Sequence, residues 1–268
     1  MASYGTSGAA RPDGAYSDKY LFIRSTDRVT GATPNAFTVK LPTTYRNVAG
    51  ISLVSAEIPF SFYNVAGAFC YGINWIWTLG GTSVLYPMVI PAGYYAITDF
   101  QSVVLSTLKA QIPAATFTSC DYHPVSGKVS VTYTGGGTLT AQSTSGRLGQ
   151  LAGCDPTGAA TSAVGGTLTF PACAQLFPFS SLLMCVDNLP ASVLSTSSLH
   201  CFARIQVNAA PGGVIMVCQG TNVGNTVSYK MPIASLDSLA ISLKNNDGTI
   251  LDLNGVDWTA TLMISSTD

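Results

Sequence analysis

The residues with the most potential for chemistry are Cys120, Asp121 and His123, which lie close together in the sequence. Thiolate, imidazole and carboxylate groups bind Zn²⁺, but a closed zinc site needs about four of them in a tetrahedral array. No second pair at ligand spacing accompanies the cluster, and only His200 and Cys201 could complete it in space. A Cys–His nucleophile from the same residues would need a geometry that spacing does not supply. We therefore expect neither a metal site nor a thiol enzyme.

The carboxylates offer two further possibilities. Asp247, Asp252 and Asp257 recur at five-residue intervals, and their oxygens could bind Ca²⁺. The spacing matches no EF-hand loop, and aspartate beside glycine or asparagine is typical of turns. Glu57, the only glutamate in the chain, lies inside an expected strand with no obvious second carboxylate for glycoside hydrolysis. The motifs HExxH, GxxxxGK[ST], GxSxG and GxGxxG are absent from the sequence, so we expect no enzyme and no cofactor.

The composition excludes some classes of partner. The chain has 268 residues, of which only 9% are charged, and its net charge is −1. A typical soluble domain has about 25% charged residues. Without a basic run, binding to nucleic acid through phosphate neutralisation is not expected. The mean hydropathy of +0.34 predicts a surface rich in uncharged polar residues, or one that neighbouring subunits cover.

No targeting or membrane segment is expected. The first 18 residues lack the basic start and apolar core of a signal peptide. No run reaches the roughly 18 apolar residues of a spanning helix. The seven cysteines form no CxxC pair and are odd in number, which favours reduced thiols buried as small hydrophobic groups. Disulfides stay possible in a particle that leaves the cell, and the sequence does not pair them.

Strands are the elements that must position these residues. In the stretch 35–64, Phe37, Val39 and Leu41 alternate with small or polar residues, as in a half-buried strand, and are candidate core anchors. Pro42 cannot donate a ladder hydrogen bond, so we expect this strand to end there and a turn to follow. A second strand, apolar on both faces, is expected over 48–58.

Further strands and one helix are expected along the chain. The final strand, 258–264, places Trp258 and Leu262 on one face as core anchors. A helix is expected over 98–111, with Thr98 and Gln101 as its capping box. A helical turn is expected at 147–151, and the other expected strands are 20–24, 70–79, 83–90, 116–121, 128–134, 182–187, 201–207, 214–218, 226–231 and 236–243.

Several stretches together resemble a known family. They are YLFIRSTDR, NAFTVKLP, NVAGISLVSAEIPFSFYN, PAGYYAITDFQSVVLSTL, PVSGKVSVTY, RLGQLAG, VDNLP and, most specific, LKNNDGTILDLNGVDWTATLMI at the C-terminus. From Tyr20 onward the chain resembles the single jelly-roll penton and related minor capsid proteins of nucleocytoplasmic large DNA viruses and virophages. Residues 151–179, which are rich in glycine and alanine, depart from this resemblance.

The resemblance implies an all-β fold: a single jelly-roll β-sandwich of about eight antiparallel strands in two sheets, with Greek-key connections, one short helix and loop insertions. We expect a flexible N-terminal arm, 1–18, and one domain, 19–268, with a Gly/Ala/Thr-rich insertion around 135–180. The implied role is structural, in the virion. Homopentamers would close the fivefold vertices against double jelly-roll major capsid proteins and other minor capsid proteins.

Two other roles stay open at this point. One is a non-vertex minor capsid protein that cements capsomers. The other is a jelly-roll module for glycan binding or host attachment, in which Trp75, Trp77, Tyr94 and Tyr95 would be the candidates for stacking on a sugar.

Four charged residues are candidate assembly contacts. Arg24, Asp27 and Arg28 concentrate charge in a charge-poor chain, directly after the first expected strand. Glu57 is expected at a strand rim or a subunit contact, with Arg46 or Arg204 as its partner.

Overall fold

The computed structural model describes residues 16–144, 146–154, 160–176, 180–189, 193–194, 200–218 and 226–267. The chain forms two compact units: unit 1, Met1–Ser61 with Phe179–Asp268, and unit 2, Phe62–Pro178. The predicted single domain, 19–268, with an insertion around 135–180, stays a prediction. Unit 2 is compact because the segment from Val65 to Phe170 buries its own hydrophobic core.

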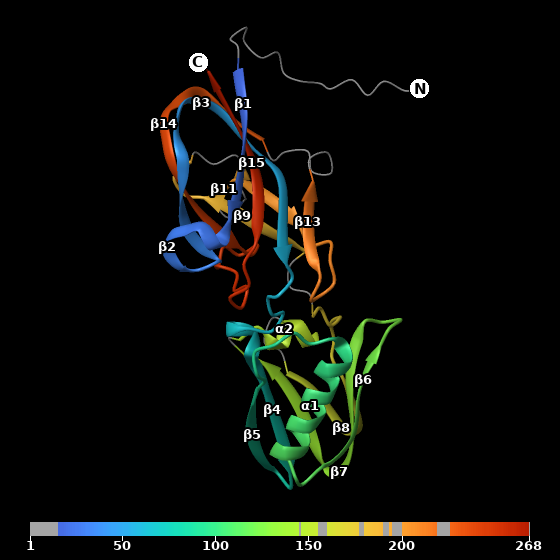
Figure 1. Ribbon diagram of the computed structural model, residues 1–268. Helices are drawn as coiled ribbons and strands as arrows, with labels where there is room; N and C mark the ends of the chain where they lie inside the picture. The colour runs from blue at the N-terminus through green and yellow to red at the C-terminus, as the bar shows by residue number, and fades with distance from the viewer. Residues whose placement is uncertain are drawn as a thin grey trace, which may run out of the picture. The chain divides into compact units, whose positions relative to one another are not determined.

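Unit 1 is built on one eight-stranded antiparallel sheet (Figure 1). Its central strand is the long β3, and the order β1-β15-β3-β14-β9-β12 is completed by β13 and β2, which both pair with β3. The strands are β1 (Tyr16–Arg24), β2 (Arg28–Thr33), β3 (Ala36–Pro59), β9 (Ser181–Val186), β12 (Ala203–Gln206), β13 (Val214–Cys218), β14 (Thr226–Lys244) and β15 (Thr259–Thr267). A short pair, β10 (Val193–Leu194) with β11 (His200–Cys201), and the 3-10 turn η1 (Ser25–Asp27) complete unit 1.

The strands β3 and β14 are long, and different parts of β3 pair with different neighbouring strands. The first part of β3 pairs with β2 and with the C-terminal part of β14, and its later part pairs with β15, β13 and the N-terminal part of β14. Figure 1 shows the two strands arching together. Asn47, with φ of 49°, lies where β3 changes partners.

The turn predicted after Pro42 is wrong, because β3 runs through this residue. The register between β3 and β14 shifts between Leu236 and Ser238, which pair with Tyr45 and Lys40. Pro42 lies within that interruption, where no ladder hydrogen bond needs its missing N–H. The two strands predicted at 226–231 and 236–243 likewise form one strand, β14.

The five candidate core anchors are buried in unit 1. Phe37, Val39 and Leu41 are between 4% and 6% exposed, and Trp258 and Leu262 are 2% and 1% exposed. The Phe37 and Trp258 rings lie 5.7 Å apart, tilted by 58°. The strand β15 begins one residue after Trp258, so this side chain enters the core from the preceding loop.

Unit 2 is a five-stranded antiparallel sheet with one long helix. The sheet order is β5-β4-β7-β6, and β8 pairs with the other side of β7. The elements are η2 (Gly67–Cys70), β4 (Tyr71–Leu79), β5 (Thr82–Val89), α1 (Ile97–Gln111), β6 (Thr116–His123), β7 (Lys128–Ser143), α2 (Leu148–Ala152) and β8 (Ala160–Thr169).

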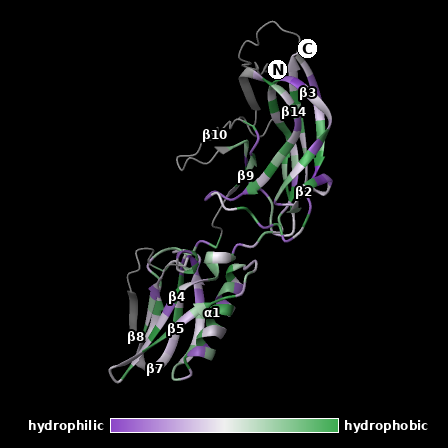
Figure 2. Ribbon diagram, turned by 90° about the vertical axis from the view of Figure 1, so that its left-hand side faces the viewer, coloured by the Kyte–Doolittle hydropathy of each residue, from purple (hydrophilic) through white to green (hydrophobic). Residues whose placement is uncertain are grey.

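The helix α1 packs one face against the core of unit 2. Phe100, Val104 and Leu108 are buried on that face, and apolar and polar residues alternate along the helix in Figure 2. The predicted cap is wrong, because the side chain of Asp99 accepts a hydrogen bond from the Ala96 N–H at 3.2 Å. Gln101 instead donates to the Cys120 carbonyl on β6, at 2.9 Å, and so ties the helix to the sheet.

The predicted fold class, an all-β jelly-roll sandwich, is confirmed: two antiparallel sheets contain most of the described residues, and helices are few. The helical turn predicted at 147–151 forms α2, so there are two α-helices among the described residues rather than one. Most of the predicted arm, 1–15, lies outside the described residues. Residues 16–18 belong to β1, where Tyr16 pairs with Thr267.

Candidate assembly surface

The predicted contact residues Arg24 and Asp27 pair with each other at the turn after β1. Arg24 Nε donates to Asp27 Oδ2 at 2.9 Å, and Nη2 donates to Oδ1 at 2.8 Å. These hydrogen bonds lower the pKa of Asp27 below its usual value. Both side chains are about half exposed, at 57% and 45%, so the pair stays accessible from solvent.

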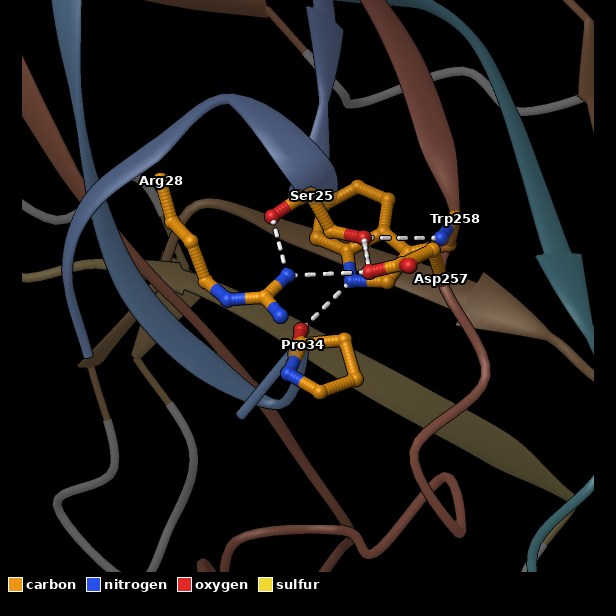
Figure 3. Close-up of polar contacts among 5 residues, drawn as sticks. All are labelled: Ser25, Arg28, Pro34, Asp257 and Trp258. Atoms are coloured by element: carbon orange, nitrogen blue, oxygen red, sulfur yellow. Dashed lines mark hydrogen bonds and ion pairs between the residues drawn. The ribbon is translucent and has the colours of Figure 1, made fainter. Parts of the chain in front are cut away.

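Arg28 is held within the subunit by a cluster that also contains Ser25, Asp257 and Trp258 (Figure 3). Arg28 Nη1 lies 3.0 Å from Asp257 Oδ1 and donates to the Ser25 carbonyl at 2.8 Å. We call these four residues the Ser25 cluster. Arg28 therefore joins the turn after β1 to the loop before β15, and its role as an assembly contact stays a prediction.

Ser25 is the centre of this cluster. Its hydroxyl donates to Asp257 Oδ1 at 2.7 Å and accepts from the Trp258 N–H at 3.0 Å. Its backbone N–H donates to the Trp258 carbonyl at 2.9 Å. The indole Nε1 of Trp258 donates to the Pro34 carbonyl at 2.7 Å. The sequence does not single out Ser25, because serine is an ordinary turn residue. Its role depends on Asp257, which is 232 residues away in the sequence and meets it only in the folded chain.

One face of the unit 1 sheet carries large apolar side chains in solvent. On β1, Leu21 and Ile23 point inward, while Tyr20 and Phe22 are 66% and 61% exposed. Across the ladder, β13 exposes Met216 at 54%. Two sets of residues lie between β1 and β13 on this face. The first is the less exposed β15 residues that pair with Tyr20 and Phe22, and the second is the polar side chains of β3. We call this surface the outer face, defined by Tyr20, Phe22, Arg24, Glu57, Thr259, Thr261, Met263 and Met216.

Glu57 lies within the outer face. It pairs with Met216 on one side and with Thr259 on the other, and Thr259 in turn pairs with Arg24. Neighbouring strands are about 4.8 Å apart, so Arg24 and Glu57 are roughly 10 Å apart in one row. Thr259 Oγ1 lies 3.5 Å from Glu57 Oε2. The structure therefore brings two of the four candidate contact residues to one surface.

The partners suggested for Glu57 are placed elsewhere. Among the described residues, neither Arg46 nor Arg204 forms an ion pair with it. Arg46 pairs with Ser235 in the ladder, and Arg204 Nε donates to Ser181 Oγ at 3.0 Å.

The edge strand β5 of unit 2 also exposes apolar side chains. Val84, Leu85 and Val89 are 44%, 52% and 63% exposed, and Leu79 at the end of β4 is 48% exposed. Each unit therefore has an apolar sheet edge in solvent.

The thiol and imidazole candidates show ordinary structural roles. Burial, and then the charge of Asp121, raises the pKa of Cys120 to about 12. His123 Nε2 lies 2.7 Å from Ser130 Oγ. Cys120 and His123 belong to unit 2, and Cys201 belongs to unit 1. Within the described ranges, no three metal-ligating side chains gather into a group.

The three aspartates of the C-terminal region are in separate local networks. Asp247 Oδ1 accepts from the Thr249 N–H at 2.9 Å, and Asp252 Oδ1 accepts from the Asn254 N–H at 2.8 Å. Asp257 belongs to the Ser25 cluster. Such side-chain bonds to a backbone N–H two residues on are turn chemistry.

The aromatic candidates for sugar stacking differ in exposure. Trp75 and Trp77 are 0% and 4% exposed. Their rings pack on Phe170 and Tyr133, with centroids 5.9 and 5.6 Å apart. Tyr94 is exposed, and the Tyr95 hydroxyl donates to the Pro91 carbonyl at 2.9 Å. The two tryptophans are therefore core residues and present no stacking surface.

The helices of the described residues are too short or too polar to cross a bilayer. The architecture defines the class of the protein as an antiparallel jelly-roll β protein.

Comparisons with family models and with curated protein sequences give no match. Comparison with solved structures gives the crystal structure of the mavirus penton protein, with a TM-score of 0.54 and 13% sequence identity. The match covers 95% of this chain and 100% of the penton chain. The chain therefore shares the fold of the mavirus penton protein.

Proposed function

We propose that this chain is a structural capsid subunit of a large icosahedral DNA virus or a virophage: a penton protein that forms homopentamers at the fivefold vertices. The observation that carries the proposal is the shared fold with the mavirus penton protein over 95% of this chain. In this role the chain resides in the virion, contacts the major capsid protein and other minor capsid proteins, and catalyses no reaction.

The outer face supports association with a second copy of the chain. In the described part of the chain, β1 forms ladder hydrogen bonds only with β15, so its other edge has no strand partner among the described residues. An open edge strand with exposed aromatic residues is a site for pairing with another chain. Tyrosine, phenylalanine and methionine are also enriched in protein interfaces.

A closed ring needs two different surfaces on each subunit, because each copy meets the next in a heterologous contact. The outer face supplies one of them in the proposal, and the apolar edge at β5 is a candidate for the other. Arg24 and Asp27, which satisfy each other at the border of the outer face, require no charged partner across the interface.

The mass of the native protein tests the proposal. Native mass spectrometry and light scattering on the purified full chain are expected to give five times the 27.8 kDa of one chain. A protein that stays monomeric at all concentrations, and is absent from the vertices of the particle in density maps, would contradict the penton role. A dimer or trimer located away from the vertices would identify a non-vertex minor capsid protein instead.

Variants of the outer face locate the contact. The double variant Tyr20→Ser/Phe22→Ser removes two exposed rings but leaves the buried Leu21 and Ile23 intact. We expect a folded protein that no longer assembles. The matched control is Val125→Ser, at a fully exposed loop position in unit 2, which should assemble normally. Normal assembly of the double variant would exclude the outer face as a subunit contact.

A further inference from the structure

Two cysteines of unit 1 come together at an irregularity between β9 and β12. The ladder pairs Ala203 with Met184. The N–H of Phe202 also donates to the Met184 carbonyl, at 2.7 Å. Two consecutive residues thus oppose one, which is a β-bulge. The extra residue shifts the pairing beyond it by one position, so Cys201 on β11 lies opposite Cys185 on β9.

The burial pattern agrees with this register. Leu183, Cys185 and Cys201 form one hydrophobic cluster, with both cysteines 3% exposed. Leu183 and Cys185 share a face because they are two residues apart on a strand. Directly opposed residues in an antiparallel pair have Cα atoms about 4.5 to 5.5 Å apart. A disulfide accepts Cα separations of about 4.4 to 6.8 Å, so the bond needs no large backbone movement.

Charged residues on the same face act on the two thiols. Lys244 and Arg204 both pair with Leu183 in the ladder, from opposite sides. Burial raises the pKa of both thiols. Lys244 opposes this effect at Cys185, and Arg204 opposes it at Cys201.

We propose that Cys185 and Cys201, which are both thiols in this structure, are a redox pair that closes into a cross-strand disulfide in an oxidising environment. The oxidant is a small disulfide such as oxidised glutathione. One cysteine thiolate attacks it to form a mixed disulfide and releases one glutathione. The second cysteine attacks that mixed disulfide and releases the other glutathione. The two cysteine thiols are oxidised, one small disulfide is reduced, and the two thiol protons pass to the released glutathione thiolates.

In the unfolded chain the bond would close a loop of about 15 residues between the two cysteines and so lower the conformational entropy of that state. For a loop of this length, cross-linking shifts the unfolding equilibrium by roughly a hundredfold toward the folded state in the chain-entropy account. The two cysteines would therefore stabilise the folded chain only after oxidation, and would stay reduced in the reducing interior of a cell.

Peptide mapping of the oxidised full-length chain tests the proposal. The best background is Cys173→Ser/Cys218→Ser, because these two cysteines are exposed and would form other bonds. The folded protein is incubated with oxidised glutathione, the remaining thiols are alkylated, and the chain is cut before its aspartates. The cut before Asp187 separates Cys185 from Cys201, and in this background each of the two fragments has a single cysteine.

The expected result is a linked pair of fragments, 155–186 with 187–236, that dithiothreitol separates. The urea midpoint should rise on oxidation in the parent, and Cys185→Ser should remove the rise. Two alkylated fragments, two separate glutathione adducts, or links to other cysteines would each overturn the proposal. The reduced form of the same protein is the control for stability, so the result does not depend on how the serine variant folds.

Discussion

Ser25 shows how a single hydroxyl can join two distant parts of the chain. Its side chain is fully buried, donates to the carboxylate of Asp257 and accepts from one backbone N–H. It therefore gives the Trp258 N–H a hydrogen-bond partner at a position that solvent does not reach. A turn position in the sequence gives no sign of this, because the partners come from the loop before β15.

We therefore expect Ser25→Ala to destabilise the protein. The substitution leaves the buried Trp258 N–H and one lone pair of Asp257 without their partner, which costs about 1–3 kcal/mol. Urea denaturation, monitored by tryptophan fluorescence, measures this loss of stability. Thr43→Ala, at an exposed position of β3, is the control and should change the free energy of unfolding by less than about 0.5 kcal/mol. Equal stability of the two variants would contradict the role given to Ser25.

The thiol of Cys120 is a second residue whose behaviour follows from burial. With its pKa raised to about 12, this cysteine has very little thiolate near neutral pH, and thiolate is the form that reacts. We expect iodoacetamide to label the exposed Cys173 first and Cys120 last, with the Cys120 rate rising as the pH increases toward its pKa. Site-resolved mass spectrometry checks the order. Labelling of Cys120 as fast as Cys173 in the folded protein would contradict it.

At the scale of elements, the strands were easier to predict than their ends. The alternation of Phe37, Val39 and Leu41 correctly indicated a half-buried strand, because it reflects only one face of a local segment. The end at Pro42 was wrong because a proline is tolerated wherever the partner strand has no carbonyl to offer. That depends on the register shift of β14, about 200 residues away. Likewise the outer face depends on pairings between β1, β15, β3 and β13, which no local pattern contains.

The glycine run of β7, where its pairing with β8 shifts register, gives a prediction at this scale. A Cβ atom on Gly137 would lie 2.6 Å from Cε2 of the buried Trp77 and 2.8 Å from the Thr78 carbonyl oxygen. Both distances are too short, so Gly137→Ala forces the strands apart and should cost about 1–3 kcal/mol. The neighbouring Gly136 has only Leu79 Cδ1 within reach, at 3.7 Å, and Gly136→Ala is the matched control. Thermal denaturation compares the two variants. A smaller effect at Gly137 than at Gly136 would mean that Trp77 is packed elsewhere.

At the scale of the whole molecule, unit 2 is continuous in sequence and unit 1 is not. Unit 2 has its own core, formed by three buried side chains of α1 and by the aromatic side chains of β4, β6 and β7. Unit 1 forms only when the segments before and after this insertion meet. Nothing in the sequence indicated this division into two units, because the strands that begin unit 2 look like ordinary core strands.

We expect the isolated segment 62–178 to fold on its own. A core of this kind is sufficient for a domain of about 100–150 residues. Circular dichroism and dispersed amide signals in NMR measure folding, and cooperative thermal unfolding confirms it. The segment 1–61, expressed as the control, should stay unfolded because the partners β14 and β15 of its long strand are missing. An unfolded 62–178 would show that the inserted unit depends on the rest of the chain.

The pairing of β1 with β15 determines how the molecule responds to mechanical force. Tyr16 opposes Thr267, and Arg24 opposes Thr259, so the chain enters β1 and leaves β15 at the same end of this strand pair. Tension applied through those two ends would act across the ladder and open its hydrogen bonds one after another, as in a zipper, instead of loading them together in shear. The β1–β15 pair would therefore separate at low force, starting from the end where Tyr16 opposes Thr267. In the proposed capsid role, subunit contacts through the outer face would avoid this opening, whereas contacts that pull on the two chain ends would cause it.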